Sequence, residues 1–147
     1  MAEGTLLAIA RKSKVRAPVE SLEAGEITVD NGLTGDHRGT PGSRQITVVS
    51  KQAWEATCRE LGDDVPWTYR RANLLVDGID LKKMSGQRLR IGEVELEITG
   101  ETEPCPRMDE QHQGLTAALA PDWRGGVTCR VLAGGRVTVG DAVTLDG

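Results

Sequence analysis

The segment 103–109 reads EPCPRMD, so that one thiol, Cys105, stands between two prolines. Pro104 fixes its own φ, and Pro106 favours an extended conformation for the residue before it, so the backbone that carries the sulfur is stiff. A neighbouring cation such as Arg107 lowers the pKa of a thiol and increases the fraction of thiolate, which is the reactive and metal-binding form. An ordinary loop cysteine explains the same residues, and the segment alone leaves both interpretations open.

The other two cysteines are interpreted as core residues. Cys58 lies on the apolar face of a predicted helix, and Cys129 alternates with valines in a predicted strand. No two cysteines have the close spacing of a zinc site or a redox pair. His37 and His112 match no zinc pattern with Cys105 either, so we expect surface or supporting histidines and leave their contribution open.

Three arginines stand next to glycines or turn residues. Arg44 follows the turn-rich segment 39–43, Arg71 precedes a predicted strand, and Arg124 precedes the glycine pair 125–126. Guanidinium groups beside exposed glycine amides suit a phosphate, or a planar heterocycle with hydrogen-bonding edges. Solvated charges at strand ends are the alternative, and charge alone does not separate the two.

The elements that must position these residues are mostly short strands. Runs with strand composition recur between turn signals at 5–10, 45–49, 73–76, 88–91, 94–99, 127–132, 137–139 and 142–145. The run 94–99 alternates strictly, so Val94, Leu96 and Ile98 should face a core. Many short strands in a small domain predict a mainly β fold, closed as a barrel because closure removes exposed strand edges.

Only two segments are predicted to be helical. Ser50 can cap a helix over 51–61, and a shorter helix over 113–120 would end at Pro121. The prediction is therefore a β-barrel with a few short helices.

Composition limits the function classes. The chain has 147 residues, which favours one domain, and its net charge of -4 argues against sequence-independent binding to nucleic acid or to an anionic membrane. No apolar run approaches the roughly 20 residues that span a bilayer, and the first residues lack the pattern of a secretory signal. We therefore expect a cytoplasmic protein with small-molecule ligands.

Several segments occur in a recognisable order: 32–39, 44–50, 71–81, 86–91 and 103–106. Together they closely resemble the MOSC domain, the family named for the C-terminal domain of molybdenum cofactor sulfurases. The resemblance covers roughly Leu6 to Leu145, and it implies a single β-barrel domain over 1–147 that binds the molybdenum cofactor, molybdopterin.

The resemblance also implies site residues. Cys105 takes the position of the cysteine that ligates molybdenum or carries sulfur as a persulfide, which makes it the predicted catalytic residue and metal ligand. Arg71 and Asn73 match the Asn-containing strand near the cofactor, and Arg44 matches the basic residue that opens the preceding strand. Arg124 joins the predicted cofactor-binding residues through its charge beside glycine amides.

Two functions follow from the resemblance. The first is a molybdenum-dependent oxidoreductase that acts on N-hydroxylated compounds and needs a separate reductase, because the chain has no flavin motif and no iron-sulfur cysteine set. The alternative is a sulfur-carrier or cofactor-delivery module that uses a Cys105 persulfide and a sulfur donor protein. The sequence does not separate an enzyme from a carrier, and a structural barrel without metal chemistry is the third interpretation.

Overall fold

The structure is a computed structural model that describes residues 2–14, 17–37, 39–103 and 108–146, so Cys105 lies outside the described residues. The described strands are β1 (Ala2–Arg11), β2 (Glu20–Leu22), β3 (Ala24–Thr28), β4 (Gly32–Leu33), β5 (Ile46–Ser50), β6 (Leu74–Asp77), β7 (Arg88–Ile91), β8 (Val94–Glu101), β9 (Val127–Ala133), β10 (Gly135–Thr138) and β11 (Ala142–Asp146). The helices are α1 (Lys51–Leu61), α2 (Met108–Gln111) and α3 (Leu115–Leu119), with the 3-10 turns η1 (Trp67–Arg70) and η2 (Pro121–Trp123).

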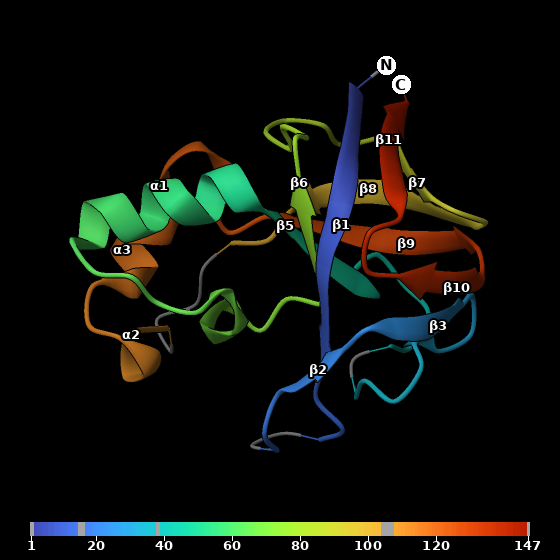
Figure 1. The fold of residues 1–147 in the computed structure, drawn as a ribbon, viewed down its shortest axis with the longest axis horizontal. Coiled ribbons are helices and arrows are strands. Elements are labelled where there is room, and N and C mark those ends of the chain that lie inside the picture. Colours follow the sequence, from blue (N-terminus) through green and yellow to red (C-terminus); the bar gives the residue numbers. More distant parts are fainter. Residues whose placement is uncertain (1, 15–16, 38, 104–107, 147) are drawn as a thin grey trace.

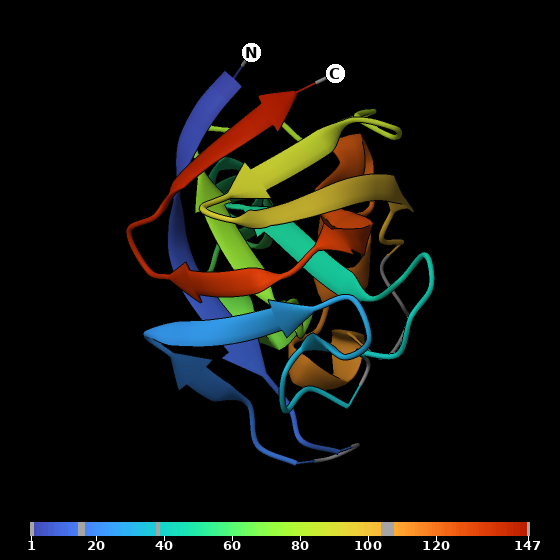
Figure 2. The ribbon, with the colours of Figure 1, turned by 90° about the vertical axis from the view of Figure 1, so that its right-hand side faces the viewer.

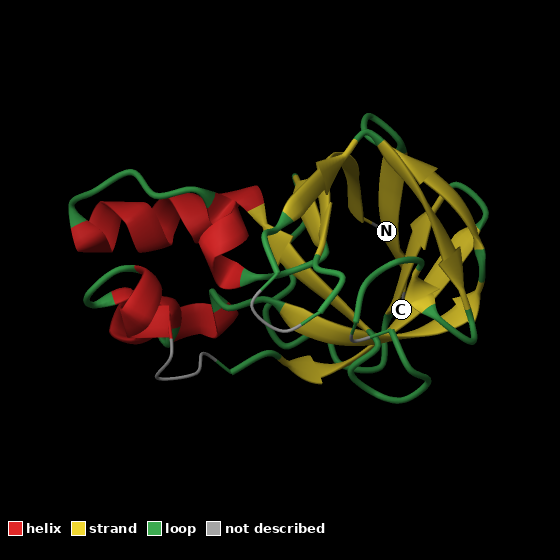
Figure 3. Ribbon diagram, turned by 90° about the horizontal axis from the view of Figure 1, so that it is seen from below, coloured by secondary structure: helices red, strands yellow, loops and turns green. Residues whose placement is uncertain are grey.

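Seven of the described strands close into a barrel. Their order is β11-β7-β8-β9-β5-β6-β1, and pairing of β1 with β11 completes the ring, which is seen from two directions in Figures 2 and 3. Neighbouring strands are antiparallel except β5 and β6, which are parallel. The prediction of a mainly β barrel with a few short helices is confirmed.

Aliphatic side chains fill the barrel because alternate residues of each strand point inward. On β8, Val94, Leu96 and Ile98 are buried, whereas Glu95 and Glu97 on the opposite face are partly exposed, as the alternation predicts. The barrel core contains only aliphatic side chains and Cys129 among its fully enclosed members, which agrees with the absence of Phe from the sequence.

A small second sheet lies at one end of the barrel, in the order β10-β3-β4, and β2 pairs antiparallel with the last residues of β1. The sequence does not predict β2, β3 and β4. In β3 the one fully buried side chain is Ile27, and in β4 it is Leu33, so neither strand has an alternating apolar pattern long enough to detect.

Helix α1 has the predicted bounds. The Oγ atom of Ser50 accepts a hydrogen bond from the backbone N–H of Ala53 at 3.1 Å, and Gly62 ends the helix in the left-handed conformation. The second predicted helix is shorter than expected, since α3 begins only after Gly114, which has φ 88°. Pro121 then starts the separate turn η2.

The helices form a layer beside the barrel, visible on the left of Figures 1 and 3. They enclose a second apolar cluster, whose buried members are Val49, Trp54, Val65, Ala72, Met108, Leu115 and Leu119. None of the described helices is long and apolar enough to cross a bilayer. The helical layer therefore packs on the barrel wall and places η1 and α2 near the barrel's end.

Candidate functional site

A cavity of about 740 Å³ lies between the loop that precedes β5, the turn η1 and the end of β8. Its lining residues are His37, Thr40, Pro41, Gly42, Ser43, Arg44, Thr47, Arg70, Arg71, Thr102, Glu103 and Met108. Guanidinium, imidazole and hydroxyl groups dominate this lining, so the cavity suits an anionic small molecule with hydrogen-bonding oxygens.

Two of the predicted arginines line this cavity together. Arg44 is an exposed residue just before β5, and Arg71 is half-buried at the end of η1. Arg71 has φ 63° and ψ 32°, and its N–H donates to the carbonyl of Thr68 at 3.0 Å. The left-handed conformation is unfavourable for a residue with a side chain, and such strain clusters at functional sites. Arg71 thus combines a strained backbone conformation with a place in the cavity lining.

Asn73 supports the cavity wall from behind. Its side chain is buried, its Oδ1 accepts from the N–H of Thr47 at 3.0 Å, and its Nδ2 donates to the carbonyl of Ala10 at 3.3 Å. Asn73 lines a small neighbouring cavity of about 20 Å³, which shares His37, Thr47 and Arg71 with the large one. The amide is engaged with backbone groups of two strands, β5 and β1, so its role in the free protein is to hold Thr47 and these strands in place.

Arg124 lies elsewhere. It lines a separate cavity of about 570 Å³ beside the start of α1, together with Lys82. Its Nη1 is 2.8 Å from Oε1 of Glu60 and donates to the carbonyl of Ala118 at 2.9 Å. The structure therefore brings Arg44 and Arg71 together, with Asn73 behind them, and it does not bring Arg124 to the same cavity.

The thiols differ in their surroundings. Cys105 falls outside the described residues, but Glu103 and Met108, which precede and follow its segment, both line the large cavity. Cys129 is fully buried in the barrel, where burial raises the pKa of its thiol. Cys58 is half-buried on α1, and its Sγ lies 3.7 Å from the carbonyl oxygen of Val65. Both were predicted to be core residues, and only Cys58 departs from this by partial exposure.

Sequence reasoning noted the pair Arg70 and Arg71 but assigned a binding role only to Arg71, whereas Arg70 makes several contacts in the cavity wall. Its side chain is buried, Nε donates to the carbonyl of Gly125 at 2.9 Å, and Nη2 donates to the carbonyl of Thr102 at 3.2 Å. Nη1 lies 3.9 Å from Sδ of Met108. Arg70 therefore ties together both described ends of the segment that contains Cys105. The adjacent Arg70 and Arg71 look alike in sequence and both line the cavity, but Arg70 is buried and paired with backbone carbonyls, whereas Arg71 is half-buried.

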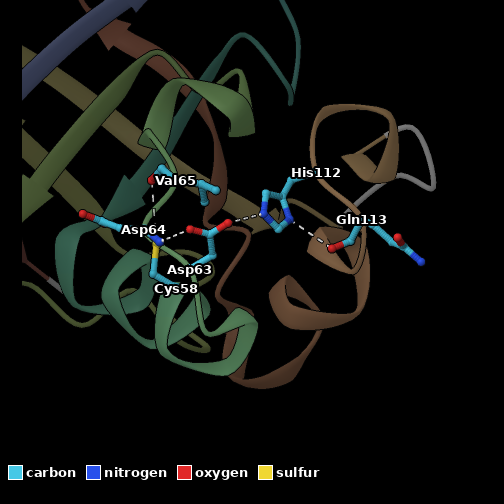
Figure 4. A network of polar contacts seen from close by, with 6 residues as sticks. All are labelled: Cys58, Asp63, Asp64, Val65, His112 and Gln113. Atoms are coloured by element: carbon cyan, nitrogen blue, oxygen red, sulfur yellow. Dashed lines mark hydrogen bonds and ion pairs between the residues drawn. The ribbon is translucent and has the colours of Figure 1, made fainter.

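The two histidines also differ. His37 lines the large cavity, and its Nδ1 lies 3.0 Å from the carbonyl oxygen of Lys12. His112 lies in the helical layer, where Nε2 is 2.8 Å from Oδ2 of Asp63 and Nδ1 is 3.0 Å from the carbonyl oxygen of Gln113 (Figure 4). The hydrogen bond to Asp63 raises the pKa of His112 and lowers the pKa of Asp63.

The cavity fits an anionic cofactor better than a metal ion held by protein side chains alone. Within the described ranges, no group of three or more His, Cys, Asp or Glu side chains could hold a metal ion. The cavity instead offers the cations Arg44 and Arg71, and the hydroxyl of Thr102, which is buried without a hydrogen-bond partner among the described residues. A buried polar atom without a partner in the free protein is what a site completed by its ligand would contain.

Residues 24–144 match the MOSC domain, which is most of the chain. The chain belongs to the MOSC domain family. This family is associated with molybdenum cofactor binding.

Solved structures show the same fold. The YUAD protein from Bacillus subtilis has a TM-score of 0.84 and 20% sequence identity to this MOSC domain, and the alignment covers 99% of this chain and 98% of that protein. YiiM from Escherichia coli has a TM-score of 0.72 at 17% identity, covering 97% and 70%. YiiM from Geobacillus stearothermophilus has a TM-score of 0.70 at 15% identity, covering 98% and 73%. No curated protein sequence matches the chain. At these identities the likeness concerns the fold.

Proposed function

We propose that this chain binds the molybdenum cofactor in the 740 Å³ cavity, with Cys105 as the metal ligand. The observation that supports this proposal best is the lining of that cavity. It contains Arg44 and Arg71, and it also contains Glu103 and Met108, the described residues that flank the Cys105 segment. The residues expected to hold an anion and those next to the expected thiolate ligand thus border one space.

The cavity residues have separate roles in this proposal. Arg44 and Arg71 bind the phosphate of the cofactor, because a guanidinium can give two parallel hydrogen bonds to phosphate oxygens. Asn73 holds the strands behind them. Arg70 fixes the carbonyl of Thr102 and contacts Met108, and it thereby holds the ends of the segment from which Cys105 offers its thiolate.

As an enzyme, the protein would reduce N-hydroxylated compounds. When bound, the cofactor would supply two-electron redox chemistry. Reduction of an N-hydroxy group to an amine consumes two electrons and two protons, breaks the N–O bond and releases water. Since the chain has neither a flavin motif nor an iron-sulfur cysteine set, we propose that a separate reductase delivers the electrons.

The second candidate uses the same thiol without substrate turnover. A thiolate at Cys105 can attack the outer sulfur of a persulfide on a donor protein, so that the donor's S–S bond breaks, the donor leaves as a thiolate and Cys105 holds the persulfide. Alternatively, the cavity can hold the cofactor for delivery. The position of Glu103 and Met108 on an open cavity is compatible with access by such a partner. The reductase and the sulfur donor are therefore alternative partners, and each predicts a different modification of the purified protein.

The test is expression in a host that makes the cofactor, followed by measurement of molybdenum, of oxidised-pterin fluorescence and of the intact mass. We expect molybdenum and pterin in the wild type and loss of molybdenum in Cys105→Ser. Cys58→Ser is the matched control, because this half-buried thiol lies on α1 and does not line the cavity, so its variant should keep the metal.

The same measurements separate the two candidates. A wild type with one added sulfur on Cys105, removable by a thiol reductant, and with neither pterin nor metal would support the carrier and contradict the metal-ligand role. A wild type that carries no metal, no pterin and no added sulfur would exclude both.

A further inference from the structure

Three threonines are buried among the described residues, and one of them differs from the others. The hydroxyl of Thr57 donates to the carbonyl of Ala53 at 2.9 Å, and the hydroxyl of Thr128 lies 2.7 Å from that of Thr99. The Oγ1 atom of Thr102 has no hydrogen-bond partner in the part of the chain that the structure describes. Thr102 is only 6% exposed, and of the three it is the one that lines the large cavity.

The backbone of Thr102 is held firmly on both sides. Its N–H donates to the carbonyl of Gly126 at 2.9 Å, and its carbonyl accepts from Nη2 of Arg70 at 3.2 Å. A Cβ atom at Gly125 would lie 2.5 Å from that carbonyl oxygen, so the two chain segments are in close contact. Because both backbone groups are paired and tightly packed, the unpaired hydroxyl is not the result of a loosely placed residue.

An unpaired buried hydroxyl is costly, and a protein could avoid it with a valine of the same shape. A ligand that enters the cavity and hydrogen-bonds to the Thr102 hydroxyl would remove this cost. Staggered rotamers place the hydroxyl and the methyl group of a threonine in exchangeable positions about the Cα–Cβ bond, so a ligand can select the one that points the hydroxyl toward it.

We propose that Thr102 is a ligand-binding residue of the cavity, and that its hydroxyl donates a hydrogen bond to an oxygen of the bound cofactor. An oxygen acceptor is favoured because the guanidinium groups of Arg44, Arg70 and Arg71 line the same cavity and attract electron-rich atoms. This inference rests on the proposed function, and it names a residue directly after β8 that neither charge nor a motif singles out.

Removal of the Thr102 hydroxyl should raise the stability of the cofactor-free protein and weaken its binding of the cofactor. In protein from a host that cannot make the cofactor, Thr102→Val should raise the melting temperature by about 2–4 °C, since it removes an unpaired buried hydroxyl. In protein from a host that makes the cofactor, the same variant should retain about tenfold less molybdenum and pterin after gel filtration. Thr102→Ser keeps the hydroxyl and should retain the cofactor at close to the wild-type level.

Thr57→Val is the matched control. It removes a buried hydroxyl that is already paired, so it should lower the melting temperature and leave the cofactor content unchanged. A Thr102→Val protein that loses stability as Thr57→Val does would overturn the inference, because the hydroxyl would then have a partner within the protein. If wild type and Thr102→Val retained equal molybdenum and pterin, the inference about Thr102 would be overturned and the proposed function would stand. A wild type without molybdenum and pterin would overturn both the proposed function and this inference.

Discussion

The barrel interior and the wall of the large cavity differ in the kinds of side chain that they contain. Inside the barrel, alternating aliphatic residues such as Leu96 are fully enclosed, and they need only apolar character and suitable volume. The cavity wall contains a buried guanidinium at Arg70, a strained cation at Arg71 and an unpaired hydroxyl at Thr102. Each of these three features has a cost for folding. Arg70 is paired with backbone carbonyls inside the protein, whereas the strained backbone of Arg71 and the unpaired hydroxyl of Thr102 have no counterpart at Leu96 in the barrel interior.

The largest effect is expected for a substitution in the barrel interior, and it should appear in the free energy of unfolding. Leu96→Ala removes a fully buried side chain and should lower the free energy of unfolding by about 2–5 kcal/mol, because the cavity left behind adds to the lost burial. Urea denaturation measures this change. Leu132→Ala on β9 is the control, since Leu132 is 39% exposed, and its cost should stay below about 1 kcal/mol. Equal costs for the two variants would contradict the assigned interior.

A smaller effect should appear at the cavity wall, and in binding rather than in stability. In Arg71→Gly, relief of the left-handed conformation offsets the greater flexibility of the unfolded chain, so the free energy of unfolding should change by less than about 1 kcal/mol. Loss of the guanidinium should lower the retained molybdenum and pterin about tenfold. Urea denaturation and metal analysis measure the two quantities on one preparation.

Lys83→Gly is the matched control for that prediction. Lys83 is another cation with positive φ, 58°, and it does not line the large cavity. Its variant should keep the wild-type cofactor content. If Arg71→Gly also kept it, the cation would have no part in binding and the contrast between cavity wall and interior would lose its main support.

The smallest expected effect is a pH dependence in the helical layer. The pKa of His112 is raised, so its contribution to stability is present below the ordinary histidine pKa and is lost as the pH rises through the raised value. The pKa of Asp63 is lowered, so its contribution is present above the ordinary carboxyl pKa and is lost as the pH falls through the lowered value. The pair should therefore stabilise the fold between about pH 4 and about pH 6.5.

Asp63→Asn tests this window through the melting temperature. The wild type should exceed the variant by more at about pH 5.5 than at about pH 8.5. A difference that is constant across this range would mean that the hydrogen bond, and not the charge of His112, is what the variant removes. Neither residue lines the large cavity, so cofactor content should not follow the same profile.

Sequence patterns of a few consecutive residues correctly predicted those elements whose formation depends on residues close together in the sequence. The alternation of β8 and the cap of α1 at Ser50 each follow from a few consecutive residues, and both predictions agree with the structure. Helix α2 follows directly on the Cys105 segment and has four residues, too few for a periodic pattern. The short strand β3 pairs with β10, which lies far away in the sequence, and β4 pairs only with β3 in the described sheet.

The site was predictable only in part for the same reason. Arg44 and Arg71 could be named from their places before two strands, and they do line one cavity. Arg124 has the same local signal of a cation beside glycines, yet its side chain lines a different cavity and pairs with Glu60. Thr102 has no local signal at all, because an unpaired hydroxyl is defined by what surrounds it in space.

The parallel pairing of β5 with β6 has a consequence for how such a site can arise. Parallel neighbours cannot be joined by a tight turn, so the chain needs a long crossover between Ser50 and Leu74. That crossover contains α1, η1, Arg70 and Arg71. Seven strands cannot close into a ring with every neighbouring pair antiparallel, so the ring requires a parallel pair. The crossover that this pair needs also places two cations in the wall of the large cavity.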